Sequence, residues 1–144
     1  MKRFSRYIAL ILVLSTLLAI PALASENPTP RASSYFGYAS VYLWKTSSSS
    51  FQIWFDVAAL DIMDKLGVSK IVLQRSSDNE NWTDIRTYNM ADYPQMVASN
   101  TGQHSGYVTY SSYNSSYYYR AKATLYAKKG SGTAEYTVYG YFAN

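Results

Sequence analysis

Short runs of alternating apolar and polar residues, separated by clusters of small polar residues, fill the chain from residue 36 onward. The runs are rich in Tyr, Val, Ile, Phe and Thr, which favour the half-buried, pleated surface of a sheet. They predict seven strands, near residues 36–45, 51–58, 69–76, 82–88, 105–111, 117–128 and 134–142. Seven short strands with frequent turns are typical of an all-β, antiparallel sandwich.

Two stretches lack this alternation. Residues 60–68 are expected to form one or two helical turns, with Asp61 as the N-cap and Gly67 as the left-handed C-terminal stop. Residues 91–102 contain a proline and a glycine and are expected to form the longer crossover between two sheets. We expect the first, second and fifth strands to share one sheet, and the third, fourth, sixth and seventh to share the other.

Alternation also predicts which side chains meet the core. In the second strand one face is wholly apolar and consists of Phe51, Ile53, Phe55 and Val57. The opposite face carries Gln52, Trp54 and Asp56, so a slip of one residue would bury a carboxylate. The inward set of the sixth strand is Tyr117, Tyr119, Ala121, Ala123 and Leu125, and that of the last strand is Tyr136, Val138, Gly140 and Phe142.

The first 24 residues have the three parts of a secretory signal peptide. A basic start is followed by an uncharged apolar run, a proline at position 21 and the small-residue sequence Ala22-Leu23-Ala24. We expect cleavage after Ala24 and a secreted, extracellular protein that begins at Ser25. The alternative is an uncleaved membrane anchor, because residues 7–25 are uncharged and barely long enough to span a bilayer.

The rest of the chain is long enough for one hydrophobic core. Residues 25–34 are polar and contain two prolines, and they predict a disordered linker. Residues 35–144 are then the β-sandwich domain. Because the chain has no cysteine, we expect packing alone to hold this exported domain together.

Charge and composition exclude several classes of function. The formal net charge is +4, but Lys2, Arg3 and Arg6 belong to the leader, and without them ten basic residues face nine acidic ones. A near-neutral domain lacks the electrostatic footprint of a nucleic-acid-binding protein. Without cysteine there is no thiolate metal site, Cys nucleophile or disulfide scaffold. Once the leader is removed, we expect no contact with a membrane.

Catalytic and metal-binding constellations are not expected. His104 is the only histidine, so we interpret it as an ordinary surface or turn residue rather than a metal ligand. Asp61 and Asp64 could be paired catalytic carboxylates, but a favourable pair at a helix N-terminus is simpler. Residues 78–81 offer oxygens to Ca²⁺ without calcium-loop spacing, and we interpret them as a β-turn satisfied by Asx side chains. We therefore predict no enzyme, cofactor or metal.

Two resemblances concern the fold and the location. The segment from Lys70 to Thr83, with Tyr118-Tyr-Arg-Ala121, resembles the C–C′ hairpin and F strand of fibronectin type III and immunoglobulin-like domains. Residues 35–142 also resemble an uncharacterised family of small secreted proteins from Gram-positive anaerobes. The motifs that carry this second resemblance are Phe55-Asp-Val57, Met63-Asp-Lys-Leu-Gly67, Arg75-Ser-Ser-Asp78, Trp82-Thr83, Tyr119-Arg-Ala121 and Ala127-Lys-Lys-Gly130. The resemblances imply an immunoglobulin-like sandwich and a bacterial secreted protein, but no activity.

Tyrosine is the unusual residue, with sixteen copies. Many of these rings could be half-buried structural residues, since tyrosine is a good strand former. Outward rings could instead recognise a partner. The candidate binding face lies on the sixth and seventh strands and consists of Tyr118, Arg120, Lys122, Tyr126, Tyr139 and Glu135. The alternative is a set of cross-strand pairs on an exposed sheet, with Arg120 paired to Glu135.

We therefore expect a secreted, non-enzymatic domain that binds an extracellular protein or glycan. Trp54 is expected to project, isolated, from the opposite side of the molecule. One alternative is a small secreted toxin or bacteriocin-like factor, although no cationic amphipathic segment supports membrane attack. The other is a hydrolase whose site has no recognisable motif.

Overall fold

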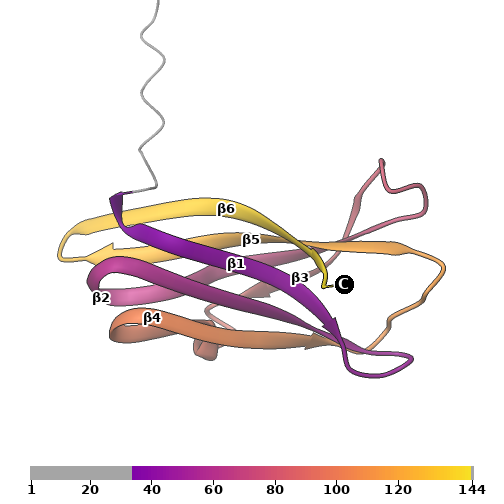
Figure 1. The fold of residues 1–144 in the computed structure, drawn as a ribbon, viewed down its shortest axis with the longest axis horizontal. Coiled ribbons are helices and arrows are strands. Elements are labelled where there is room, and N and C mark those ends of the chain that lie inside the picture. The colour runs from indigo at the N-terminus through magenta and orange to yellow at the C-terminus, as the bar shows by residue number, and fades with distance from the viewer. Residues whose placement is uncertain (1–33, 144) are drawn as a thin grey trace, which may run out of the picture.

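A computed structural model describes residues 34–143, so the predicted signal peptide and all but the last residue of the predicted linker lie outside the described residues. Strands dominate the described part (Figure 1). They are β1 (Phe36–Lys45), β2 (Phe51–Ser76), β3 (Thr83–Asn89), β4 (Val97–Tyr110), β5 (Tyr118–Lys129) and β6 (Gly132–Phe142), with a 3-10 turn η2 (Pro94–Met96) before β4. The all-β prediction is confirmed.

The longest strand, β2, joins the second and third predicted strands. Its N-terminal half pairs with β1 and its C-terminal half with β5, while β4 pairs with both halves along the other edge. The predicted helical turns at 60–68 are therefore wrong. Helix propensity is a weak local preference, and it is overridden here because residues 65–67 have a partner strand on each side.

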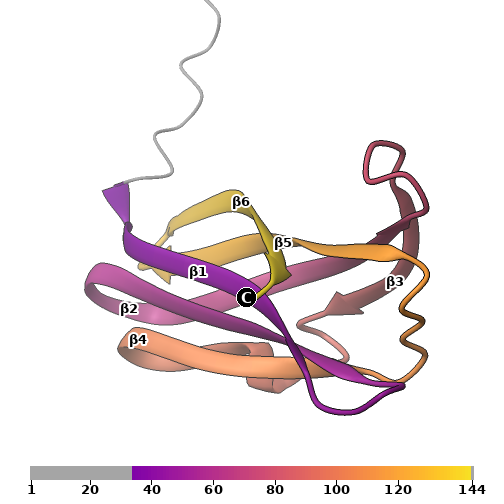
Figure 2. The same ribbon diagram turned by 45° about the vertical axis from the view of Figure 1, so that its right-hand side comes forward.

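The strands form one sheet that closes on itself (Figures 1 and 2). β1, the first half of β2 and β4 are neighbours, as are β3, the second half of β2, β5 and β6, in agreement with the predicted groups. A parallel pairing joins β1 to β6 at Tyr42–Tyr141 and Leu43–Phe142. The sandwich of two separate antiparallel sheets with seven strands is therefore wrong. The core is a small closed barrel of β1, β2, β5 and β6, because β2 passes between the layers without a break and the first and last strands meet.

Most of the predicted inward faces are buried. The apolar face of the first half of β2 is at most 1% exposed, while Gln52, Trp54 and Asp56 are only partly buried. In β5 the inward side chains from Tyr119 to Leu125 are buried as well. Tyr136 of β6 was predicted inward and is exposed. β1 pairs with β6 only at Tyr141 and Phe142. The part of β6 near the β5–β6 turn, which includes Tyr136, therefore has no β1 residue paired with it.

A cluster of aromatic rings fills one end of the barrel. The centroid of Phe51 lies 5.2–5.7 Å from four other rings, which belong to Tyr110, Tyr113, Tyr119 and Phe142. Edge-to-face and tilted pairs at this spacing contribute beyond their buried area. Part of the high tyrosine content is therefore structural.

The crossover between β3 and β4 is shorter than predicted, since β4 begins at Val97. The backbone of η2 reaches β2 at Gly67, where an added Cβ would overlap the carbonyl oxygen of Met96. Gly67 also has a φ of +154°. The predicted positive φ is therefore present, but it serves a close approach of two backbone segments rather than the end of a helix.

Candidate binding surfaces

The six predicted surface residues lie on the outer side of β5 and β6, where the register brings four of them together as two cross-strand pairs. Lys122 is opposite Tyr139, and Tyr126 is opposite Glu135. Tyr118 begins β5 opposite Ser76 and is 54% exposed. The face therefore exists as a run of outward side chains, but it does not converge on one point.

Arg120 is held by its neighbours. The centre of its guanidinium lies 4.2 Å from the centroid of Trp82 and 4.9 Å from that of Tyr139. Its Nε donates a hydrogen bond of 2.7 Å to Oε1 of Gln74, whose amide donates to Oδ1 of Asp84 at 2.6 Å. Cation–π contacts contribute about 0.5–1 kcal/mol each at exposed sites. These contacts already occupy much of the guanidinium, and they join β2, β3, β5 and β6.

The predicted ion pair between Arg120 and Glu135 is not formed. Glu135 instead accepts a hydrogen bond of 3.3 Å from Oγ of Ser69. Within residues 34–143 the recorded ion pair joins Lys129 to Asp61. The outer side chains of β5 and β6 thus make cross-strand contacts, but with partners other than those predicted.

A second outer surface, on β4, β2, β1 and β6, carries four aromatic side chains in line. The strand register places Tyr107 opposite Trp54, Trp54 opposite Tyr42, and Tyr42 opposite Tyr141. The centroids of Trp54 and Tyr42 are 6.4 Å apart with planes 5° from parallel, and those of Trp54 and Tyr107 are 4.7 Å apart at 38°. We call these four residues the aromatic row. Trp44, two residues beyond Tyr42 on β1, is 55% exposed.

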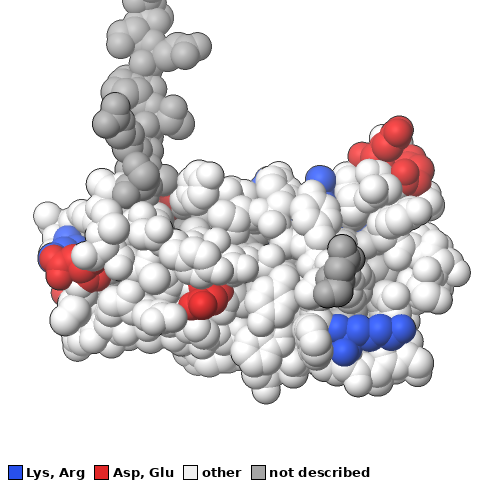
Figure 3. Space-filling view, in the orientation of Figure 1, with Lys and Arg blue, Asp and Glu red and all other residues white. Residues whose placement is uncertain are grey.

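The aromatic row is accessible and pre-ordered. Tyr107 and Tyr141 are 44% and 51% exposed, and Trp54 and Tyr42 are partly buried between them. The indole N–H of Trp54 donates to Oε1 of Gln52 at 3.0 Å, which fixes the orientation of the ring. Figure 3 shows the face over β6, β1, β2 and β4 with one acidic patch near its middle, a basic patch toward the lower right and charged side chains of both signs at the left end.

Trp54 lies on the outer face, as its alternation predicts, but the prediction that it is isolated is wrong. Of its ring neighbours, Tyr42 lies on the preceding strand β1 and Tyr107 on the more distant β4, and the register of the two pairings aligns them. A partial signal was present, because Val41 and Leu43 alternate with Tyr42 and Trp44 and so mark the latter two as outward.

The carboxylates weighed for catalysis hold the β5–β6 turn. Asp61 forms the ion pair with Lys129, whose hydrogen bond lowers the pKa of Asp61 below its usual value. Oδ2 of Asp64 accepts a hydrogen bond of 2.6 Å from the backbone N–H of Gly130. The predicted role of the two acids at a helix N-terminus is therefore wrong, because this part of β2 is extended.

His104 lies within β4 rather than in a turn. Its Nε2 is 2.9 Å from the carbonyl oxygen of Gln95, and its ring centroid is 5.5 Å from that of Phe55. Among the residues that the structure describes, no group of three or more metal-ligating side chains is found. The histidine is thus a bridge between β4 and the segment that precedes it.

The Asx interpretation of residues 78–81 is confirmed. The Asp78 carboxylate accepts hydrogen bonds of 2.7–2.9 Å from the side chain of Asn81, the hydroxyl of Ser76 and the backbone N–H groups of Glu80 and Asn81. These bonds, those from Asn81 foremost, hold the pKa of Asp78 well below its usual range. They account for the carboxylate without a cation.

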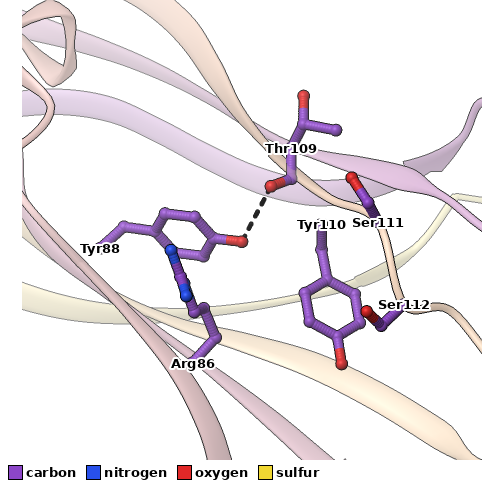
Figure 4. A pocket seen from close by; sticks show the side chains of 6 residues that line it. All are labelled: Arg86, Tyr88, Thr109, Tyr110, Ser111 and Ser112. Atoms are coloured by element: carbon purple, nitrogen blue, oxygen red, sulfur yellow. Dashed lines mark hydrogen bonds between the residues drawn. The ribbon is translucent and has the colours of Figure 1, made fainter.

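A cavity of about 240 Å³ lies between β3 and the end of β4 (Figure 4). The hydroxyl of Tyr88 donates to the carbonyl oxygen of Thr109 at 3.0 Å, and burial raises the pKa of Tyr88 to about 12. The guanidinium of Arg86 lies over the Tyr88 ring and donates to the hydroxyl of Tyr93 at 3.4 Å. The Tyr88 bond ties β3 to β4, and the Arg86 bond ties β3 to the segment before η2. Exposed Ser111 and Ser112 complete the wall.

No protein-family model, curated protein or solved structure matches this chain. In residues 34–143, no helix is long and apolar enough to cross a membrane.

Proposed function

We propose that this chain is a secreted, non-enzymatic domain that binds an extracellular protein or glycan through the aromatic row. The alignment of Tyr107, Trp54, Tyr42 and Tyr141 carries the proposal. Tyr and Trp supply large contact area at a low entropic cost, because each has only two side-chain torsions. Strands are also more rigid supports for a site than loops. The row therefore has the properties of a pre-ordered recognition surface.

The aromatic row is favoured over the predicted face on β5 and β6. On that face Arg120, the residue best suited to grip a polar partner, is already stacked between two rings and bonded to Gln74. A partner would have to compete with these contacts. In the aromatic row the only recorded polar bond, from Trp54 to Gln52, orients a ring without covering the exposed tyrosines beside it.

Trp54→Ala is expected to weaken binding of the partner by about tenfold or more, since central aromatic anchors dominate binding energy. The measurement is biolayer interferometry of the secreted protein against immobilised extracellular glycans and surface proteins. Tyr118→Ala, an exposed aromatic of β5, is the matched control and should bind like the wild type. Loss of binding in Tyr118→Ala and Tyr126→Ala, with Trp54→Ala unaffected, would assign the site to the β5–β6 face.

The secreted location belongs to the same proposal and is supported by the pattern of the first 24 residues. The secreted form is expected to begin at Ser25, because the signal peptidase requires the small residues that precede it. Mass spectrometry of the protein from culture medium checks this directly. A protein that retains residues 1–24 would contradict secretion by cleavage.

We also propose a relationship to the immunoglobulin-like and fibronectin type III-like folds, and to the secreted family that the sequence resembles. The neighbours β1–β2–β4 and β3–β2–β5–β6 support it, since they follow the order that the resemblance implies. The unbroken β2 and the barrel closure are departures from that pattern. No contact in residues 34–143 favours the toxin-like or hydrolase alternatives.

A further inference from the structure

We infer that the free edge of β4 pairs with β4 of a second copy of this chain, so that the protein forms a dimer with two-fold symmetry. An edge strand presents unpaired backbone N–H and C=O groups, which are a template for another strand. In residues 34–143, β4 pairs with β2 and with no other strand. Figures 1 and 2 show β4 at the border of the strands, with no strand beyond it. The inference goes beyond the proposed binding function and does not depend on it.

Backbone hydrogen bonds show which residues of β4 face the free edge. In an antiparallel pair, the backbone groups of successive residues point alternately toward the partner strand and away from it. The N–H and C=O of Gln103 bond to the hydroxyl of Thr101 at 3.2 and 2.7 Å, and the C=O of Thr109 accepts a bond from β3. Gln103 and Thr109 therefore point away from β2. Ser105 and Tyr107, which alternate with them, also face the free edge.

The spacing of the aromatic rings agrees with this assignment. Opposed residues that exchange no backbone hydrogen bonds have closer side chains than those that do. The ring centroids of Trp54 and Tyr107 are 4.7 Å apart, whereas those of Trp54 and Tyr42, on the other side of β2, are 6.4 Å apart. Trp54 thus directs its backbone groups to β1, which leaves those of Tyr107 for the free edge.

The free edge is open only at its middle, and this opening is symmetric. The bonds at Gln103 and Thr109 cover its two ends. Within residues 34–143, no protein group bonds to the backbone of Ser105 or Tyr107, which flank Gly106. A two-fold axis through Gly106 places Ser105 of one copy opposite Tyr107 of the other, so each copy pairs the open groups of its partner. A longer foreign strand would have to displace the bonds at both ends.

The side chains of β4 permit pairing with an identical strand. Near a two-fold axis each side chain lies close to its own copy, so a charged strand would bring like charges together. Val97–Tyr110 contains no Asp, Glu, Lys, Arg or Pro. The other edge strand, β3, has only seven residues and carries Asp84 and Arg86, and both short length and charge discourage edge pairing. Charge and length therefore select β4 as the edge that self-associates.

The dimer places two aromatic rows on one continuous face. Opposed residues of an antiparallel pair have their side chains on the same side of the sheet. Tyr107 is the ring of the row that lies on β4, so the Tyr107 ends of the two rows are nearest the axis. A partner with repeated sites can then contact both rows and gain affinity from the second contact.

Sedimentation velocity of the secreted protein, from about 1 μM to about 1 mM, tests the inference. We expect the dimer fraction to rise with concentration, because a short edge buries less than the 800 Å² or so on each partner that is usual for a stable interface. Ser105→Pro should lower the association constant about tenfold or more, because it removes an N–H that faces the free edge and not β2. Ser105→Ala keeps this N–H and is the matched control, which should associate like the wild type.

Hydrogen exchange of the wild type gives a second readout that needs no substitution. The amides of Ser105 and Tyr107 should exchange about tenfold or more slowly at the highest concentration than at the lowest. The amide of Gly106 faces β2 and should be protected at both. Circular dichroism shows whether Ser105→Pro is folded, and if it is not, the exchange of the wild type decides.

Three outcomes would overturn the inference. The protein could stay monomeric throughout the concentration range, or a folded Ser105→Pro protein could dimerise as well as the wild type. Protection of Ser105 and Tyr107 at every concentration would mean that a segment of the same chain covers the edge. Trp54→Ala should still dimerise even where it no longer binds the partner, so self-association and the proposed binding function fail separately.

Discussion

Replacing Phe55 with alanine is expected to lower the free energy of unfolding by about 3–5 kcal/mol. The ring is 1% exposed and lies against Gly106, where an added Cβ would come within 2.7 Å of its Cζ. The wall on that side is therefore backbone of β4, which cannot easily collapse into the space left by the ring. The loss is a large part of the total stability of about 5–15 kcal/mol that is usual for a domain.

Urea denaturation of Phe55→Ala and Gln52→Ala measures this difference. Gln52 lies on the opposite face of the same strand and its substitution should cost under about 0.5 kcal/mol, because it forfeits one partly exposed hydrogen bond to Trp54. Equal losses in the two variants would show that the side chains of this strand do not divide into an inner and an outer face.

The second large effect is expected for Gly67→Ala, which should destabilise the domain by about 3 kcal/mol. A φ of +154° is unfavourable for alanine, and the new methyl group would overlap the carbonyl oxygen of Met96 and press on Val97. Since both obstacles are backbone atoms, η2 and β4 would have to move away from β2. Thermal unfolding should show a much lower Tm.

Gly102→Ala is the matched control. A Cβ at this glycine would lie 3.7 Å from the nearest atom, the carbonyl oxygen of Asp61, which is an ordinary contact. Its Tm should stay close to that of the wild type. A Gly67→Ala protein with the same Tm as Gly102→Ala would refute the close approach of the two backbone segments.

Alternation of side chains was sufficient to predict where most of the strands lie and most of their inner faces, but not the continuity of β2 or the start of β4. The first strand was predicted at 36–45 and is observed as Phe36–Lys45, and Phe55 and Leu125 face the core as expected. The reason is that a strand has only two faces, and in these strands one choice would bury a charge. The turn at Asp78 was predictable for a similar local reason, because its side chain bonds to backbone two and three residues away.

Local pattern failed where partners distant in the sequence decide the conformation. Residues 60–68 have the spacing of a helical turn, yet β4 and β5 supply hydrogen-bond partners on both sides of residues 65–67 and keep them extended. Tyr136 alternates in step with the inward residues of β6, but it lies where β1 no longer pairs with β6, and its side chain is exposed.

For the candidate site too, alternation predicts one part and strand pairing decides the other. The outward position of Trp54 follows from its alternation with Ile53 and Phe55. The alignment of its ring with Tyr107, Tyr42 and Tyr141 does not, because it depends on the register of three separate strand pairings, one of them the parallel pair that closes the barrel. Alternation specifies the face on which a side chain lies. Its neighbours on that face are specified by pairings between strands that can be about a hundred residues apart, and these pairings form only as the barrel closes.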